Sequence, residues 1–178
     1  AAAAHLPRPH GDVMDADALL AAIRGVMTTR WGWPIAECFH FFGLCLLFGT
    51  VGFFDLRMLG VARGVDLRAL HRLVPFGVAG FFTSAVSGLM FVATTPDQYL
   101  HNPAFLIKLT LMLAAGLNMA LFYLICVRTV WLTKPGDLPP VPARLFGAVS
   151  LLCWLAVVTC GRVITAFRPP SFYWCPWC

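Results

Sequence analysis

Glu37 and His40 stand three residues apart in the stretch Ala36–Leu44, which is otherwise apolar. Ionisable side chains inside an apolar run are costly to bury, and they commonly mark a functional site or an ion pair. On a helix the two residues share one face, so His40 could join a charge network, handle protons or present a nitrogen to a metal. A structural hydrogen bond is the alternative for His40.

Two cations extend this set, because Lys108 and Arg162 each lie about one helical turn inside the end of a later apolar run. Glu37 would neutralise either cation and so relieve the cost of burying it. We therefore expect a charge network of Glu37, Lys108 and Arg162 at one depth. The alternative is that the long basic side chains reach the lipid headgroups separately.

The elements that must position these residues follow from the composition. Hydrophobic residues make up 60% of the 178 residues and charged residues 12%, with a mean hydropathy of +0.79. These values are typical of membrane proteins rather than soluble domains. Four apolar windows each approach the roughly 20 residues needed to cross a bilayer, at about residues 34–54, 73–95, 104–127 and 145–167.

We therefore predict an all-α fold, an integral membrane four-helix bundle over residues 31–168. Residues 1–30 form an N-terminal segment outside the membrane, and residues 169–178 form a C-terminal tail. Within the N-terminal segment, residues 16–29 show apolar side chains at helical spacing, which indicates a short amphipathic helix on the outer surface. An ordinary solvated helix docked on the bundle is the alternative.

Orientation follows from the basic residues between the spans. The connections after the first and third spans carry Arg57, Arg63, Arg68, Arg72, Arg128, Lys134 and Arg144, whereas residues 95–103 carry none. This asymmetry predicts both termini on the outer, periplasmic side. The net charge of +5 is mostly a topology signal, and no basic surface interleaved with aromatic residues indicates nucleic acid.

Other polar residues have simpler interpretations. Asp55 and Arg57 follow the first span and are predicted to anchor its inner boundary. Asn118, at mid-depth in the third span, is predicted to bond across helices. Small residues recur every four positions in the second span, which suits close helix packing or a haem lying against the helix; they are Gly80, Ser84 and Gly88.

Cys175 and Cys178 form a Cys-x-x-Cys in the tail, on the predicted outer side. In an oxidising compartment this spacing suggests a redox-active or structural disulfide. If a histidine followed Cys178 in the gene, the motif would instead be a covalent c-type haem site. Zinc would need two further ligands. The cysteines within the spans are predicted to be small buried hydrophobes; they are Cys38, Cys45, Cys126, Cys153 and Cys160.

A family resemblance runs over about residues 31–168. Its motifs are Trp33-Pro34-Ile35-Ala36-Glu37 with His40, Gly43-Leu44, Gly49, Asp55-Leu56-Arg57 and Gly60, then Asn102-Pro103-Ala104-Phe105 with Lys108, Asn118 and Gly161-Arg162. This pattern is similar to a family of uncharacterised bacterial four-helix membrane proteins. The layout also resembles the membrane part of the CopD copper-resistance proteins and, more distantly, b-type cytochromes that exchange electrons with quinones. The resemblance implies a multi-pass protein of the bacterial inner membrane.

The resemblance also limits where a haem b could bind. Neither the second nor the fourth span has an internal histidine, and His71 and His101 lie at connections on opposite faces. His101 shares a face with His40, so these two are the geometrically sensible pair of axial ligands.

The sequence is compatible with three functions. The first is a membrane-anchor or electron-transfer subunit of a respiratory or photosynthetic complex, binding haem b or quinone near the outer face at His40 and His101. Lys108 and Arg162 would supply cationic donors to haem propionates or a quinone carbonyl. The second is a cofactor-free structural subunit. The third is copper handling in the CopD manner, with His40 and soft ligands nearby. A non-catalytic subunit, with other membrane or periplasmic subunits as partners, is favoured because no nucleophile–base constellation is present.

Overall fold

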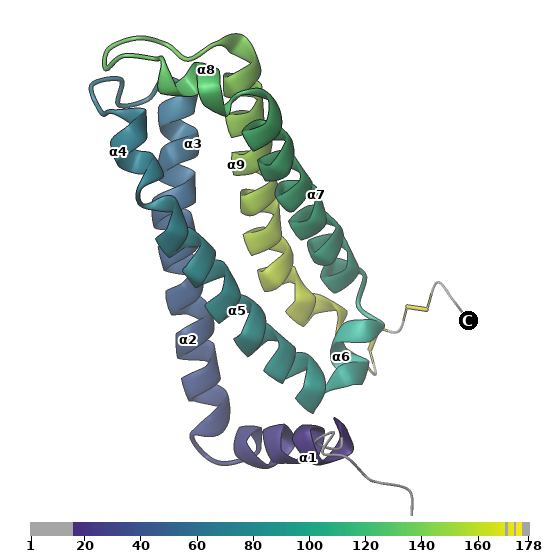
Figure 1. Cartoon of the computed structure of the whole chain (residues 1–178). Coiled ribbons are helices and arrows are strands. Elements are labelled where there is room, and N and C mark those ends of the chain that lie inside the picture. Colours follow the sequence, from purple (N-terminus) through teal and green to yellow (C-terminus); the bar gives the residue numbers. More distant parts are fainter. Residues whose placement is uncertain (1–15, 170, 173, 176–178) are drawn as a thin grey trace, which may run out of the picture.

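The computed structural model describes residues 16–169, 171–172 and 174–175, which form helices and no β-strand (Figure 1). Four helical segments within this part of the chain are long and apolar enough to cross a membrane: Gly32–Met58, Leu67–Thr94, Pro103–Ile125 and Val141–Phe167. The prediction of an all-α chain with four helices long and apolar enough to cross a membrane is confirmed for the described residues.

The first spanning segment is one helix interrupted by a wider turn. It consists of α2 (Gly32–Leu47), the π-helical turn η1 (Phe48–Gly52) and α3 (Phe53–Met58). In η1, the hydroxyl of Thr50 donates to the carbonyl of Leu46 over 2.8 Å. A π-helical turn inserts a residue into the helix and rotates everything that follows it. The helix therefore continues to Met58, beyond the predicted end of the span.

The first helical hairpin pairs α2 with α5 (Val74–Thr94), after the short α4 (Leu67–His71). Small residues allow the two helices to approach closely. A Cβ added to Gly43 would lie 2.5 Å from the carbonyl oxygen of Gly80 and 2.5 Å from the hydroxyl of Ser84. Gly88 lies against the ring of His40 in the same way, so the predicted stripe of small residues packs on α2.

The second hairpin pairs α7 (Pro103–Ile125) with α9 (Val141–Val163), which continues into the 3-10 turn η2 (Ile164–Phe167). The short helices α6 (Pro96–Leu100) and α8 (Val127–Trp131) lie at the two ends of α7. Asn102 caps α7 by accepting a hydrogen bond from the amide of Ala104, and Pro103 occupies the first turn, where its missing N–H costs nothing.

The N-terminal helix α1 (Ala16–Met27) packs across the end of α5 (Figure 1). Its last residue, Met27, is buried with Ala36 and Phe91 in a small apolar cluster. The guanidinium of Arg24 donates to the carbonyl of Ala93 over 2.9 Å. We refer to this end of the bundle, with α1 and α6, as the α1–α6 end.

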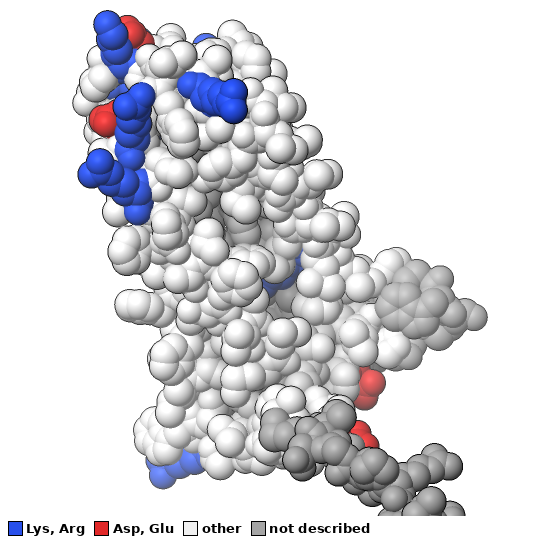
Figure 2. Space-filling view, in the orientation of Figure 1, with Lys and Arg blue, Asp and Glu red and all other residues white. Residues whose placement is uncertain are grey.

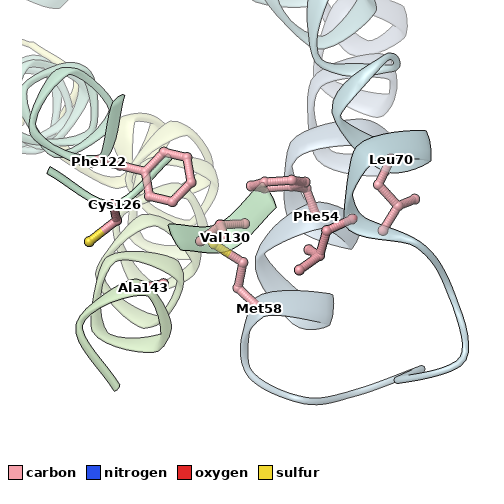
Figure 3. Close-up of a cluster of buried hydrophobic side chains, with 8 residues drawn as sticks. Phe54, Met58, Leu70, Phe122, Cys126, Val130 and Ala143 are labelled. Atoms are coloured by element: carbon pink, nitrogen blue, oxygen red, sulfur yellow. The ribbon is translucent and has the colours of Figure 1, made fainter. Parts of the chain in front are cut away.

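The two hairpins meet mainly at the opposite end, which we call the α4–α8 end. Figure 3 shows its apolar core, where Phe54 and Met58 approach Phe122 and Val130 from the other hairpin. Gly147 of α9 permits the contact, because a Cβ there would lie 3.1 Å from Met58. The hairpins are therefore joined at one end through α3 and α9.

Arg57 is completely buried at the α4–α8 end, with an exposed fraction of 0%. Its guanidinium donates to the carbonyl of Val65 over 2.7 Å and to that of Asp137 over 3.4 Å, so it links two loops. Its side chain therefore binds backbone carbonyls inside the protein at the end of the first spanning segment, and its predicted place at the inner boundary of the membrane stays a prediction.

Basic side chains gather on the surface of the α4–α8 end, and Figure 2 shows this concentration above a face that is almost entirely uncharged. Arg63, Arg68, Arg72, Arg128 and Lys134 are the exposed basic residues there. A basic side chain is also visible in a recess of the apolar middle of this face (Figure 2).

Candidate functional site

Glu37 lies exposed on α2 near the α1–α6 end. Its carboxylate accepts a hydrogen bond from the indole nitrogen of Trp33, one turn earlier, over 3.1 Å. No ion pair between Glu37 and either Lys108 or Arg162 occurs in the described part of the chain. The predicted network is not formed there, because Glu37 faces Trp33 on its own helix.

His40 is half-buried and turns toward α5. Its Nδ1 lies 3.1 Å from the hydroxyl of Ser87, and its ring meets Phe91 edge-on at 5.8 Å. The single hydroxyl proton of Ser87 has backbone carbonyls as acceptors, that of Thr83 at 2.8 Å and that of Ser84 at 3.1 Å. We therefore infer that Nδ1 of His40 carries the proton and donates to Ser87, which leaves the lone pair on Nε2.

Lys108 is half-buried on α7 beside α9. A Cβ on Gly161 would lie 3.6 Å from its ammonium nitrogen, so the glycine leaves room for the charge. Lys108 and Glu37 both lie near enough to His40 to act on it electrostatically. The structure thus brings Lys108, Glu37 and His40 into one region, although without direct pairing among these described residues.

Arg162 does not join this region by any recorded contact. Its side chain is exposed, and its backbone carbonyl accepts a hydrogen bond from the hydroxyl of Thr165 over 2.9 Å. This position agrees with the alternative in which a long basic side chain reaches the lipid headgroups.

The remaining predicted site residues lie at the α1–α6 end. His101 follows α6, and its carbonyl accepts from the amide of Trp174 over 3.3 Å. The recorded partners of His40 lie instead on α5, so the structure does not show His40 and His101 as a pair. Cys175 is disulfide-bonded, and the other five described cysteines are free. Cys178 lies outside the described residues.

Tyr99, on α6, also belongs to this end. Burial raises the pKa of its phenol, and the negative charge of Glu37 acts in the same direction, whereas the positive charge of Arg168 opposes it. Within the described residues no group of three His, Cys, Asp or Glu side chains could hold a metal ion. Cys38 is exposed on α2 and does not complete a soft-ligand set with His40.

A cavity of about 250 Å³ lies deeper in the bundle, between the two hairpins. Residues of α2, η1, α3, α5, α7 and α9 line it. Most are aromatic or aliphatic, and three are the flexible methionines Met58, Met112 and Met119. The only polar side chains among the described lining residues belong to Asp55, Asn118, Tyr123 and Ser150. A small-molecule site usually has this composition, with a few polar groups in a mostly apolar concavity.

Asp55 is the buried acid of this cavity, with an exposed fraction of 2%. Ser150, on α9, is a polar neighbour of Asp55 and also lines the cavity. The Oδ2 of Asp55 is buried and has no hydrogen-bond partner in the described part of the chain. A buried polar oxygen without a partner is costly and unusual, so it is a natural point for a ligand to bind. Asp55 lines the cavity, and its predicted place at the inner boundary of the membrane stays a prediction.

Tyr123 and Asn118 reach the cavity from α7. The hydroxyl of Tyr123 lies 2.8 Å from Nε2 of His71 on α4. Asn118 donates its amide to the carbonyl of Phe146 on α9 over 3.0 Å, which confirms the predicted bond across helices. Tyr123 therefore connects the cavity with α4, whereas Asn118 holds α7 against α9.

A second, more open groove runs between α2 and α5 on the outside of the bundle, with a volume of about 650 Å³. Trp31, Phe39 and Phe82 are among its walls, and Ser87 is part of its floor. This hydroxyl already bonds to His40 and Thr83. The groove therefore offers a ligand fewer available polar partners than the inner cavity.

The chain matches no protein-family model, and comparison with curated proteins and with solved structures likewise finds no similar protein. The resemblance to the uncharacterised bacterial family therefore stays a prediction, and function must be argued from the site itself.

Proposed function

We propose that this is a quinone-binding membrane protein, acting as an electron-transport subunit, and that the quinone ring occupies the cavity around Asp55. The single observation that carries this proposal is Asp55, whose buried Oδ2 has no hydrogen-bond partner among the described residues and whose side chain lines an aromatic, methionine-rich cavity. A quinone combines an apolar ring with two carbonyl oxygens, so it matches both the walls and the polar points of this site.

The hydrogen bonding supports this ligand. Burying an ionised carboxylate in apolar surroundings without a cation is costly, and the nearest cation in sequence, Arg57, is directed to backbone carbonyls. The neutral acid of Asp55 would donate to one quinone carbonyl. The hydroxyl of Tyr123 lines the same cavity and would serve the other carbonyl. Aromatic walls favour stacking of the ring.

The arrangement of the hairpins supports access from the lipid. α2 packs along α5 and α7 along α9, whereas the two pairs meet chiefly through α3 and α9. The cavity lies between the facing sides of α5 and α7. A lipophilic ligand could therefore enter from the bilayer without crossing water.

We further propose that the α4–α8 end faces the cytoplasm and the α1–α6 end faces the periplasm of a bacterial inner membrane. The exposed basic residues of the α4–α8 end support this orientation through the positive-inside rule (Figure 2). In this orientation α1 lies at the outer surface of the membrane, where its apolar residues would enter the interface.

Binding is tested with tetramethyl-1,4-benzoquinone and purified protein in lipid nanodiscs. Trp154 lines the cavity, so a bound quinone should quench its fluorescence. We expect saturable quenching that is largely lost in Trp154→Phe. Asp55→Leu removes one hydrogen bond, worth about 0.5–1.5 kcal/mol, and should weaken the affinity by roughly 2- to 13-fold. Gly116→Phe should block binding, because Gly116 lines the cavity and a Cβ there meets no atom within 4 Å, which leaves room for a ring that would compete with the quinone.

The matched control is His40→Ala, which changes the site predicted from the sequence and leaves the cavity intact. Unchanged quenching in this variant is expected. Loss of quenching in His40→Ala, with normal binding in Asp55→Leu, would place the ligand near His40 instead and refute the proposal.

The haem alternative is tested separately. A reduced-minus-oxidised spectrum with a haem band that disappears in His40→Ala would support His40 as an axial ligand.

A further inference from the structure

The side chains of Tyr123, which lines the cavity, and His71, on α4, are joined by a hydrogen bond. The phenol oxygen and Nε2 of His71 are 2.8 Å apart. Three aromatic rings meet the imidazole edge-on, those of Phe54 at 6.2 Å, Tyr123 at 5.7 Å and Trp131 at 5.9 Å. His71 is therefore fixed in orientation, with one nitrogen directed at the cavity residue Tyr123.

The other side of His71 leads toward water. His71 is the last residue of α4 and is only half-buried, and the exposed Arg72 follows it. The loops of the α4–α8 end surround this position. His71 thus lies between Tyr123, which lines the cavity, and the exposed Arg72 of that end.

Asp55 and Tyr123 are the two ionisable side chains among the described residues that line the cavity. The charged groups on the elements around Asp55 are engaged elsewhere or lie outside the cavity. On its own helix, Arg57 binds loop carbonyls; on α4, Arg68 donates to the carbonyl of Trp131. Arg144, on α9, does not line the cavity. No charged side chain of the described lining therefore competes with Tyr123 for a proton of Asp55.

We infer that Asp55 exchanges its proton with the aqueous phase at the α4–α8 end through the cavity, Tyr123 and His71. The proton passes from the carboxyl group of Asp55 through the cavity contents to the phenol of Tyr123, then to the imidazole of His71 and finally to water. This inference deepens the proposed function. It rests on the proposed function only for the identity of the ligand in the cavity, a quinone. It would make quinone binding proton-linked to one side of the membrane.

The transfer involves protons only. The O–H bond of the Asp55 acid breaks, and its proton passes to the oxygen of a water molecule in the cavity, which releases one of its own protons toward Tyr123. The cavity is large enough for several waters, each of which takes about 30 Å³. Tyr123 accepts a proton from the cavity as it donates its own to Nε2 of His71, and the imidazolium releases a proton from its other nitrogen. No electron moves, so no oxidant or reductant is needed.

The test follows the carboxylic acid C=O stretch of Asp55 by infrared spectroscopy, using the whole protein in nanodiscs. The band is assigned by its loss in Asp55→Leu, and its shift after rapid transfer to D₂O gives the rate of proton exchange. A positioned proton-transfer group commonly contributes a factor of about 10² or more to a rate. We expect Tyr123→Phe and His71→Phe each to slow the exchange by about tenfold or more, and Tyr99→Phe, the matched control, to leave it unchanged.

Equal rates in Tyr123→Phe, His71→Phe and the unmodified protein, with unchanged melting temperatures, would overturn the inference. The absence of any Asp55 acid band at neutral and mildly acid pH would overturn it as well. Quinone quenching is measured on the same variants, so the two proposals are separable. Slowed proton exchange in the variants, without quinone binding, would support the proton connection and refute the quinone proposal. Quinone binding with unaltered proton exchange would support the quinone proposal and refute the proton connection.

Discussion

Asn102 should be one of the most sensitive positions of the bundle, and its replacement by Ala is our most direct stability prediction. The residue is completely buried, with an exposed fraction of 0%. Its Nδ2 donates to the carbonyls of Ile164 over 2.9 Å and Phe167 over 2.8 Å, and its Oδ1 caps the amide of Ala104 over 3.1 Å. One side chain thus begins α7 and holds the end of α9.

The expected loss can be worked out from these bonds. Removing a helix N-cap costs about 1 kcal/mol. Each of the two carbonyls loses a hydrogen bond worth about 1 kcal/mol, so Asn102→Ala should lower the free energy of unfolding by about 3 kcal/mol. Asn102→Ser retains a capping oxygen and should lose about 2 kcal/mol. For a chain of this size, each 1 kcal/mol shifts the melting temperature by about 2–4 °C.

The assay is the loss of far-ultraviolet circular dichroism on heating in detergent. We therefore expect Asn102→Ala to melt about 6–12 °C below the unmodified protein. Asn118→Ala is the matched control, because it removes one bond, to the carbonyl of Phe146, and membrane-buried hydrogen bonds average about 0.6 kcal/mol. The reasoning is refuted if Asn102→Ala melts no lower than Asn118→Ala, or if Asn102→Ser melts no higher than Asn102→Ala.

Two further predictions concern α2. Gly43→Ala should destabilise the protein by about 1–3 kcal/mol, because the new Cβ would lie 2.5 Å from the carbonyl oxygen of Gly80 and 2.9 Å from the amide of Ser84. Gly116→Ala, which meets nothing within 4 Å, is its control in the same melting assay, and equal effects of the two would contradict the packing argument. Glu37→Gln should change stability by less than about 0.5 kcal/mol, since the amide oxygen can still accept from Trp33; a loss well above this would indicate an ion pair with Lys108 or Arg162.

Much of the fold could be predicted from the sequence because bilayer thickness fixes the length of an apolar helix. The windows at 73–95 and 104–127 nearly coincide with the helices Val74–Thr94 and Pro103–Ile125. Pro103 and Asn102 also mark the start of α7 correctly. The first apolar window ends at residue 54, four residues before the helical segment, because the charged Asp55 and Arg57 end the apolar run although the helix continues to Met58.

The candidate site was harder to predict, because depth along a helix can be estimated from sequence whereas direction around the helix cannot. Glu37, His40 and Lys108 do share a region, as their depths suggested, yet Glu37 bonds to Trp33 and His40 bonds to α5. Asp55 was assigned to the membrane boundary because it follows the apolar window. The sequence carries one signal for a continued helix. An acid and a base, Asp55 and Arg57, follow the glycines of one apolar run without a helix-ending residue between them.

The position of the cavity follows from the way the two hairpins are joined. Each hairpin closes along its length, with Gly43 against Gly80 in the first and Asn118 bonded to Phe146 in the second. Between the hairpins, the apolar core around Phe54 and Phe122 closes only the α4–α8 end (Figure 3). The cavity lies next to this junction, since Phe54, Met58 and Phe122 belong both to the core and to the cavity lining, and Asp55 is the acid that lines it. A ligand in this space would contact both hairpins at once, so its binding should favour the arrangement in which the two hairpins pack against each other.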